Sequence, residues 1–147
     1  MTEQVFSDSE LADLRCLAGM IVPASARYNV PGADDERIFA DIVRSIGRDE
    51  DAVRDALATL RRLAGGAFGP LERAQRAEVA AKLREQGGRP VGVLTRIVLL
   101  CYYRDDRAMI SLGLEPRPPF PKGHVLEQGD WSLLDPVRAR KPFWRQV

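Results

Sequence analysis

Few residues in this chain combine the side-chain type and the spacing that chemistry requires. His124 is the single histidine, so any Ser-His-Asp triad would depend on it, and a zinc site with two imidazoles is excluded. It lies in the turn 121–124, and we expect an exposed loop histidine rather than a catalytic base. Cys16 and Cys101 lack Cys-x-x-Cys spacing and lie in apolar helical patterns, where a free thiol usually fills core space. We therefore predict no catalytic residue, no cofactor site and no metal site in this chain.

The densest group of polar and aromatic side chains is the segment Tyr102–Arg107, which reads Tyr-Tyr-Arg-Asp-Asp-Arg. Two interpretations are equally favoured by the residues. The arginines and carboxylates order a junction between two helices, or the segment holds a partner. Two other acidic groups, 34–36 and 49–51, are expected at helix N-termini, where carboxylates interact with unpaired amides.

Glycine and arginine patterns give no sign of phosphate binding. The run Gly65–Gly69 follows a helical pattern and no strand precedes it, so we interpret it as a helix stop rather than a phosphate loop. The pair Arg61-Arg62 and the stretch Arg138–Lys141 are expected to be solvated. A nucleic-acid binder usually needs a concentrated basic face, and Lys+Arg 22 against Asp+Glu 21 argues against one.

The elements that must position these residues are helices, since 3–4 spacing of apolar residues runs almost without interruption from Ser7 to Ser111. The fold class is all-α, with about five helices in a single domain. The expected helices run from the capping box Ser7–Glu10 to a stop at Pro23, from Asp34 to Gly47, from Asp49 to Gly65, from Leu71 to Glu85, and from Pro90 through Tyr102.

The last two of these helices differ in apolar content. The helix 71–85 has only Leu71, Val79 and Leu83 as apolar anchors, so we expect it at the periphery. The helix 90–102 is apolar on nearly every side. A helix with that pattern is usually central and covered by its neighbours.

The C-terminal part changes character, because six of the ten prolines lie in the final 32 residues. We therefore divide the chain into a helical domain, residues 1–114, and an extended arm, residues 115–147, which lacks long regular structure and packs on the domain and on a partner. The predicted partner-binding residues are the arm aromatics Phe120, Trp131, Phe143 and Trp144, together with Tyr103 and Asp105. Among the arm residues, Trp131 is expected to serve the core of this chain, and Phe143 and Trp144 the interface.

Size and composition set the broad class. A chain of 147 residues that is 45% hydrophobic and 29% charged fits one globular domain, and both general disorder and a disulfide framework are disfavoured. The longest apolar run, 97–103, is far shorter than the roughly 20 residues of a membrane span. Residues 1–6 carry no basic and apolar leader, so we expect a cytoplasmic protein.

Two segments resemble a known family. Ile21-Val22-Pro23, a short loop, and Pro31-Gly32-Ala33 before a helix are similar to the opening of the gluconate 2-dehydrogenase subunit 3 family. The segment 102–105, ahead of Ser111-Leu112-Gly113 and a tryptophan-bearing arm, is similar to that family's late tyrosine–aspartate region. The resemblance covers roughly residues 8–131. This sequence departs from the family in having no twin-arginine leader and no glycine-rich, asparagine-containing segment after the tyrosines.

The resemblance implies a non-catalytic small subunit that binds and stabilises a FAD-dependent large subunit acting on an alcohol or sugar hydroxyl. The FAD and the catalytic residues would belong to that large subunit. The alternative is a stand-alone helical enzyme or ligand-binding domain that uses Tyr102–Arg107 and His124.

Overall fold

The computed structural model describes residues 6–116 and 127–141, and these residues form helices and no strand. The all-α prediction is confirmed for them. The chain divides into two compact units, 1–116 and 117–147, which are described separately. The first unit contains α1 (Asp8–Ile21), α2 (Glu36–Ser45), the 3-10 turn η1 (Gly47–Asp49), α3 (Glu50–Ala64), α4 (Arg73–Gln86), α5 (Gly88–Arg104) and α6 (Asp106–Ser111).

The helix boundaries follow from local capping chemistry at most positions. The Ser7 hydroxyl accepts from the Glu10 amide, and Glu10 Oε2 accepts from the Ser7 amide at 2.8 Å, so the predicted capping box is confirmed. Asp35 caps α2 by accepting from the amides of Arg37 and Ile38. Gly65 ends α3 in the left-handed region, at φ 71°.

The predicted cap at Asp49 is wrong. Asp49 occupies the N-cap position of α3, but its side chain makes no capping hydrogen bond. Instead, Asp49 Oδ2 accepts from Arg96 Nη2 of α5 at 2.7 Å. The Asp49 carboxylate therefore binds an arginine of α5 and accepts no hydrogen bond from the backbone amides at the start of α3.

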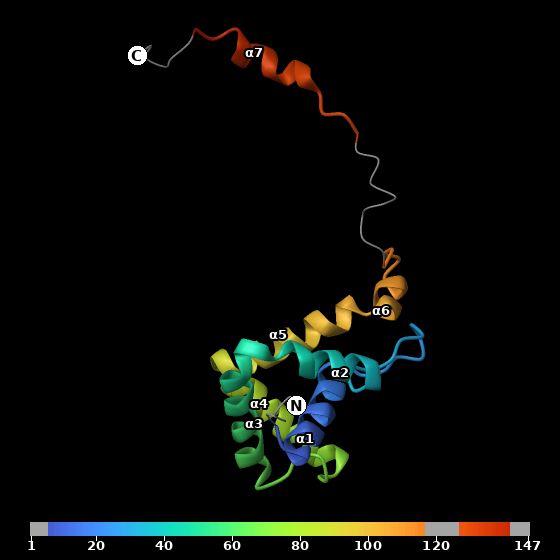
Figure 1. Cartoon of the computed structure of the whole chain (residues 1–147), viewed down its shortest axis with the longest axis vertical. Coiled ribbons are helices and arrows are strands. Elements are labelled where there is room, and N and C mark those ends of the chain that lie inside the picture. Colours follow the sequence, from blue (N-terminus) through green and yellow to red (C-terminus); the bar gives the residue numbers. More distant parts are fainter. Residues whose placement is uncertain (1–5, 117–126, 142–147) are drawn as a thin grey trace, which may run out of the picture. The chain divides into compact units, whose positions relative to one another are not determined.

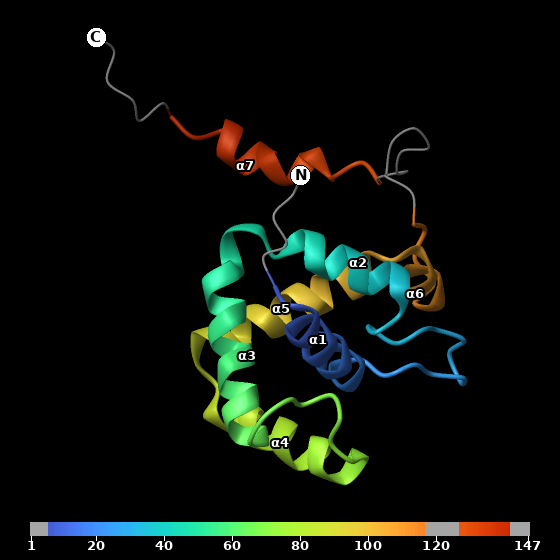
Figure 2. The same cartoon turned by 60° about the horizontal axis from the view of Figure 1, so that its bottom comes forward.

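The first unit is organised around contacts of α5 with α2 and α3 and of α3 with α4. Figures 1 and 2 both show α3 and α4 at the end of the unit away from α6, which follows α5 at the opposite end. The core comes from every long helix, with Leu14, Ile42, Leu60, Phe68 and Val98 among the residues that it buries most completely. Two of the three expected anchors of α4, Val79 and Leu83, are buried in it. The third, Leu71, precedes the helix and packs half-buried against the core.

The expectation that α5 is covered on all sides is wrong. Its buried residues, Leu94, Ile97, Val98, Cys101 and Tyr102, belong to one side of the helix. Leu100 is 57% exposed and Tyr103 is 52% exposed. Neighbouring helices of this unit cover one side of α5. The opposite side also carries apolar residues, but these are exposed.

The loop between α1 and α2 packs closely on the end of α1. The Ala33 amide donates to the Val22 carbonyl at 2.8 Å, and Ser25 and Val30 pair across the loop. A Cβ on Gly32 would lie 2.9 Å from the Ala24 backbone nitrogen and 3.2 Å from the Val22 carbonyl oxygen, so only glycine fits there. In both views this loop lies at the same end of the unit as α6 (Figure 2).

The second unit contains the 3-10 turn η2 (Trp131–Leu134) and the short helix α7 (Asp135–Arg138). Asp130 caps η2 by accepting from the amide of Ser132. Trp131 is 64% exposed, and its expected packing against the core of the chain stays a prediction. Phe120, His124, Phe143 and Trp144 lie outside the described residues.

The count of about five helices omitted α6 and α7, which have 6 and 4 residues. Helices this short carry too few residues to repeat an apolar face. They depend on their caps and flanking residues, such as Asp105 before α6 and a proline at the start of α7.

Candidate functional site

The segment Tyr102–Arg107 forms the junction between α5 and α6. Arg107 lies at its centre, with Nη2 2.7 Å from Asp35 Oδ1 and Nε 2.9 Å from Asp105 Oδ1. Asp105 also caps α6 by accepting from the Arg107 amide at 3.0 Å. One arginine therefore joins the start of α2 to the start of α6.

The charges at this junction support one another. Hydrogen bonds from Arg107 hold the pKa of Asp105 and the pKa of Asp35 below their usual values, and the two carboxylates raise the pKa of Arg107. Asp105 is buried, and Arg37 approaches it from the solvent side at 3.8 Å. The predicted partner residue Asp105 is thus engaged within its own chain.

Two further side chains of the segment bind neighbouring elements. The Tyr102 hydroxyl donates to the Pro31 carbonyl at 3.2 Å, and burial raises the pKa of this phenol. Arg104 Nη2 donates to Asp41 Oδ2 at 2.6 Å and to Ser45 Oγ at 2.8 Å on α2. Two interpretations of the segment were an ordered junction between helices and a partner-binding site. The contacts of Tyr102, Arg104, Asp105 and Arg107 agree with the first.

Tyr103 is the member of the segment that faces away from this network. Its ring meets the Tyr102 ring edge-on, with centroids 5.2 Å apart, and its side chain is half exposed. It borders a shallow hollow of about 600 Å³ on the side of α5 that neighbouring helices leave uncovered. We call this surface the α5 outer face; it comprises Gly92, Thr95, Arg96, Leu99, Leu100, Tyr103 and Arg104.

Three of the predicted partner-binding residues, Tyr103, Asp105 and Trp131, are among the described residues. Tyr103 and Asp105 lie at the same end of α5, one on the outer face and the other in the junction. Trp131 belongs to the second unit. The interface role of Tyr103 and of the arm aromatics stays a prediction.

One buried carboxylate was not identified from the sequence. Asp13 is 1% exposed and accepts three hydrogen bonds, from the amides of Phe68 and Gly69 at 2.9 and 2.8 Å and from Arg61 Nε at 2.7 Å. A signal was present, because Asp13 lies one helical turn before Leu17 on the apolar stripe of α1.

This network corrects the prediction that Arg61 is simply solvated. Arg61 pairs with Asp13 and also donates to Ser9, which ties α3 to α1. The segment 65–69 does more than stop a helix, since it places the fully buried Phe68 and two amides on the Asp13 carboxylate. The role of these residues is structural.

The cysteines behave mostly as expected. Cys101 is buried in the core, and burial raises the pKa of its thiol. Cys16 is half-buried, and its sulfur accepts from Arg76 Nη1 at 2.9 Å. Within residues 6–116 and 127–141 there is no group of three or more His, Cys, Asp or Glu side chains placed to hold a metal ion.

Among the residues that the structure describes, no helix combines the length and the apolar content that crossing a bilayer requires. Comparison with protein-family models, curated proteins and solved structures finds no match to this chain. The resemblance to the gluconate 2-dehydrogenase subunit 3 family therefore rests on the segments 21–33 and 102–113 and on the composition of the arm.

Proposed function

We propose that this chain is a non-catalytic accessory subunit, and that the α5 outer face is its docking surface for a FAD-dependent dehydrogenase acting on an alcohol or sugar hydroxyl. The observation that carries the proposal is the exposure of Leu100 and Tyr103 on a helix whose other side is buried in the core. Tyrosine at a rigid, exposed apolar surface is typical of protein interfaces.

The junction beneath this surface supports the same function. Asp105 and Arg107 fix the end of α5 against α2, so Tyr103 is presented from an ordered element and loses little freedom on docking. Exposed apolar residues continue in α6, at Ile110, and beyond its end, at Leu112 and Leu114. The flavin and the reacting groups would reside on the partner.

The alternative, a stand-alone enzyme or ligand-binding domain, has less support. A catalytic or ligand site in Tyr102–Arg107 would need free polar groups, yet Tyr102, Asp105 and Arg107 are each bonded to other parts of the fold. His124, the remaining member of that site, lies outside the described residues.

The test is co-expression of this chain with a candidate FAD-dependent dehydrogenase from the same organism, followed by size-exclusion chromatography. We expect both proteins and FAD absorbance in one peak. Tyr103→Glu should abolish co-elution, whereas Tyr28→Glu should not, because Tyr28 is similarly exposed, at 60%, but lies on the loop between α1 and α2. Separate elution of wild-type chain and flavoprotein, with the flavoprotein equally soluble and active alone, would refute the proposal.

A further inference from the structure

A second hollow lies between α1, α4 and α5, reaches Ala56 of α3, and shares only Thr95 with the α5 outer face. Its volume is about 500 Å³, within the roughly 300–1,000 Å³ range of small-molecule sites. We call it the α1–α4–α5 pocket. Its floor contains Leu17, Leu83 and Leu94, which belong to the buried core, so the pocket is part of the folded unit rather than a surface crease.

The pocket exists because α4 turns small side chains toward its neighbours. Ala77, Ala80 and Ala81 line it on the α4 side, where larger residues would fill the space. The remaining walls are apolar. Among the described lining residues only Arg84 and Thr95 are polar, and none is acidic.

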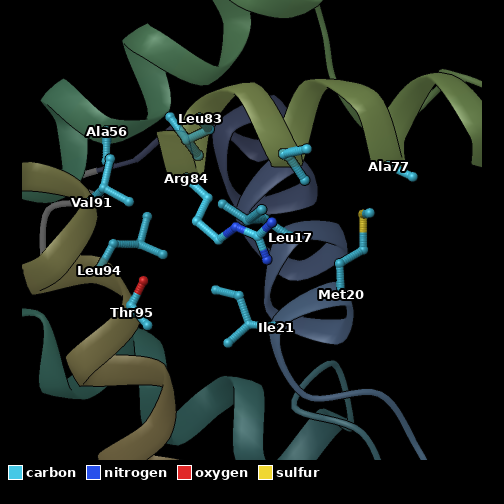
Figure 3. A pocket seen from close by; sticks show the side chains of 12 residues that line it. Leu17, Met20, Ile21, Ala56, Ala77, Leu83, Arg84, Val91, Leu94 and Thr95 are labelled. Atoms are coloured by element: carbon cyan, nitrogen blue, oxygen red, sulfur yellow. The ribbon is translucent and has the colours of Figure 1, made fainter. Parts of the chain in front are cut away.

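Arg84 gives the pocket a charge. Figure 3 shows its side chain reaching from α4 into the hollow, between Leu17 of α1 and Leu94 of α5. Its guanidinium makes no hydrogen bond or ion pair with any described residue. Arg84 is exposed, so its guanidinium stays solvated without a counter-ion. Because it lies beside apolar walls, it favours an anionic ligand that also has an apolar body.

The neighbouring surface adds to the same charge. A third hollow, next to the α1–α4–α5 pocket, shares Met20 and Ala77 with it. This third hollow is lined by Arg15, Arg73 and Arg76, against the single carboxylate of Asp34. Arg76 Nε is buried there with no hydrogen-bond partner among the residues that the structure describes. The positive potential around the mouth therefore favours entry of an anion.

We propose that the α1–α4–α5 pocket binds an aliphatic monocarboxylate of medium chain length, with the carboxylate on Arg84 and the hydrocarbon against Leu17, Leu83 and Leu94. A guanidinium matches a carboxylate through two parallel hydrogen bonds, and the walls supply apolar contact along the chain. This binding function does not depend on the flavoprotein partner.

The experiment is a titration of the ¹⁵N-labelled full chain with octanoate and, in parallel, with octan-1-ol. We expect saturable chemical-shift changes for residues lining the pocket with octanoate, and weaker binding of the neutral alcohol. In the series hexanoate, heptanoate, octanoate, affinity should rise about fourfold per methylene until the pocket is filled.

Three variants test the assignment. Arg84→Gln should weaken octanoate binding by about twofold to fivefold, as expected for an ion pair at an exposed arginine, and leave octan-1-ol binding nearly unchanged. Arg62→Gln is the matched control, since Arg62 bonds Gln86 outside the pocket and its loss removes the same charge. Ala81→Leu should fill the cavity and weaken binding of both ligands, with a circular dichroism spectrum that shows intact helices.

The proposal fails if octanoate and octan-1-ol bind equally and Arg84→Gln changes neither. It also fails if no saturable shifts occur, or if they fall outside the pocket lining. Because the readout is ligand binding to this chain alone, these outcomes are distinguishable from loss of co-elution with the flavoprotein.

Discussion

Arg107 concentrates the charge interactions of the α5–α6 junction in one side chain. It bonds Asp105 two residues away and Asp35 72 residues away. The Asp105 carboxylate is buried, so losing its partner leaves a charge that water cannot solvate well. Stability and pH dependence should both report on this residue.

We expect Arg107→Gln to lower the free energy of unfolding at pH 7 by about 1–3 kcal/mol. The folded pKa values of Asp35 and Asp105 lie below their unfolded values, so their contribution is present above about pH 4 and is lost as the pH falls through the folded pKa values. The variant lacks most of this contribution and should lose less stability between neutral pH and pH 3. Urea titrations at pH 7, 5 and 3 measure both effects.

Arg44→Gln is the control for that experiment. Arg44 lies 3.6 Å from Asp41 in an exposed pair, which contributes roughly 0–1 kcal/mol. An equal loss of stability in the two variants, or an unchanged acid profile in Arg107→Gln, would contradict the role given to Arg107.

Asp13→Asn should also destabilise the first unit, by about 1–3 kcal/mol. An asparagine oxygen can still accept from the Phe68 and Gly69 amides, but its NH₂ group then faces the Arg61 Nε–H donor. A double-mutant cycle with Arg61→Gln measures the coupling in urea unfolding. Additive losses in the double variant would show that Arg61 and Asp13 do not act together.

Hydrogen-bond partners could be predicted from the sequence only where the two residues lie close together along the chain. The Ser7–Glu10 box and the Asp35 cap were predictable because donor and acceptor lie within three residues. The partners of Asp13 lie 48 to 56 residues away, and the partner of Asp49 is 47 residues away. Apolar spacing carries no information about such pairs.

At the scale of elements, close packing of the α1–α2 loop depends on Gly32. We expect Gly32→Ala to destabilise the first unit, because its Cβ would press on backbone atoms of Val22 and Ala24, which cannot rotate away. The matched substitution Gly92→Ala in α5 meets nothing within 4 Å and should stabilise the helix by about 0.5–1 kcal/mol. Thermal melts should show a lower melting temperature for Gly32→Ala and a higher one for Gly92→Ala. A higher melting temperature for Gly32→Ala would show that the loop is packed less closely than described.

The helices themselves were largely predictable, but their surroundings were not. The sequence predicted the helix α5 but not which side of it is buried, and the structure shows that this side carries Leu94, Ile97, Val98 and Cys101. Leu99, Leu100 and Tyr103 are equally apolar, and hydrophobicity alone cannot distinguish a residue covered by its own chain from one that a partner covers. The uncovered side of α5 therefore appeared only in the structure.

At the scale of the whole molecule, every buried core residue in the described part of the chain belongs to the first unit, from Phe6 to Ala108. We expect a chain that ends at Pro116 to keep the helices α1 to α6 and the melting temperature of the full chain. Under the proposed function, the same truncation should weaken assembly with the flavoprotein, because it removes Phe120, Trp131, Phe143 and Trp144. Circular dichroism melts and co-elution measure the two parts separately.

Either of two results would contradict the assignment of folding to the first unit and of partner binding to the arm. A truncated chain that unfolds would show that the arm stabilises the helical unit. Undiminished co-elution would show that docking requires the first unit alone.

The buried Asp13 carboxylate has a consequence for the exchange of backbone amide hydrogens with solvent deuterium. Loop amides ordinarily exchange quickly, because small local openings expose them to water. The amides of Phe68 and Gly69 belong to the loop between α3 and α4, yet they donate to a carboxylate that is closed off between α1 and α3. Their exchange requires the separation of α1 from this loop, so these two loop positions should be protected to a degree otherwise found in the helices of the core.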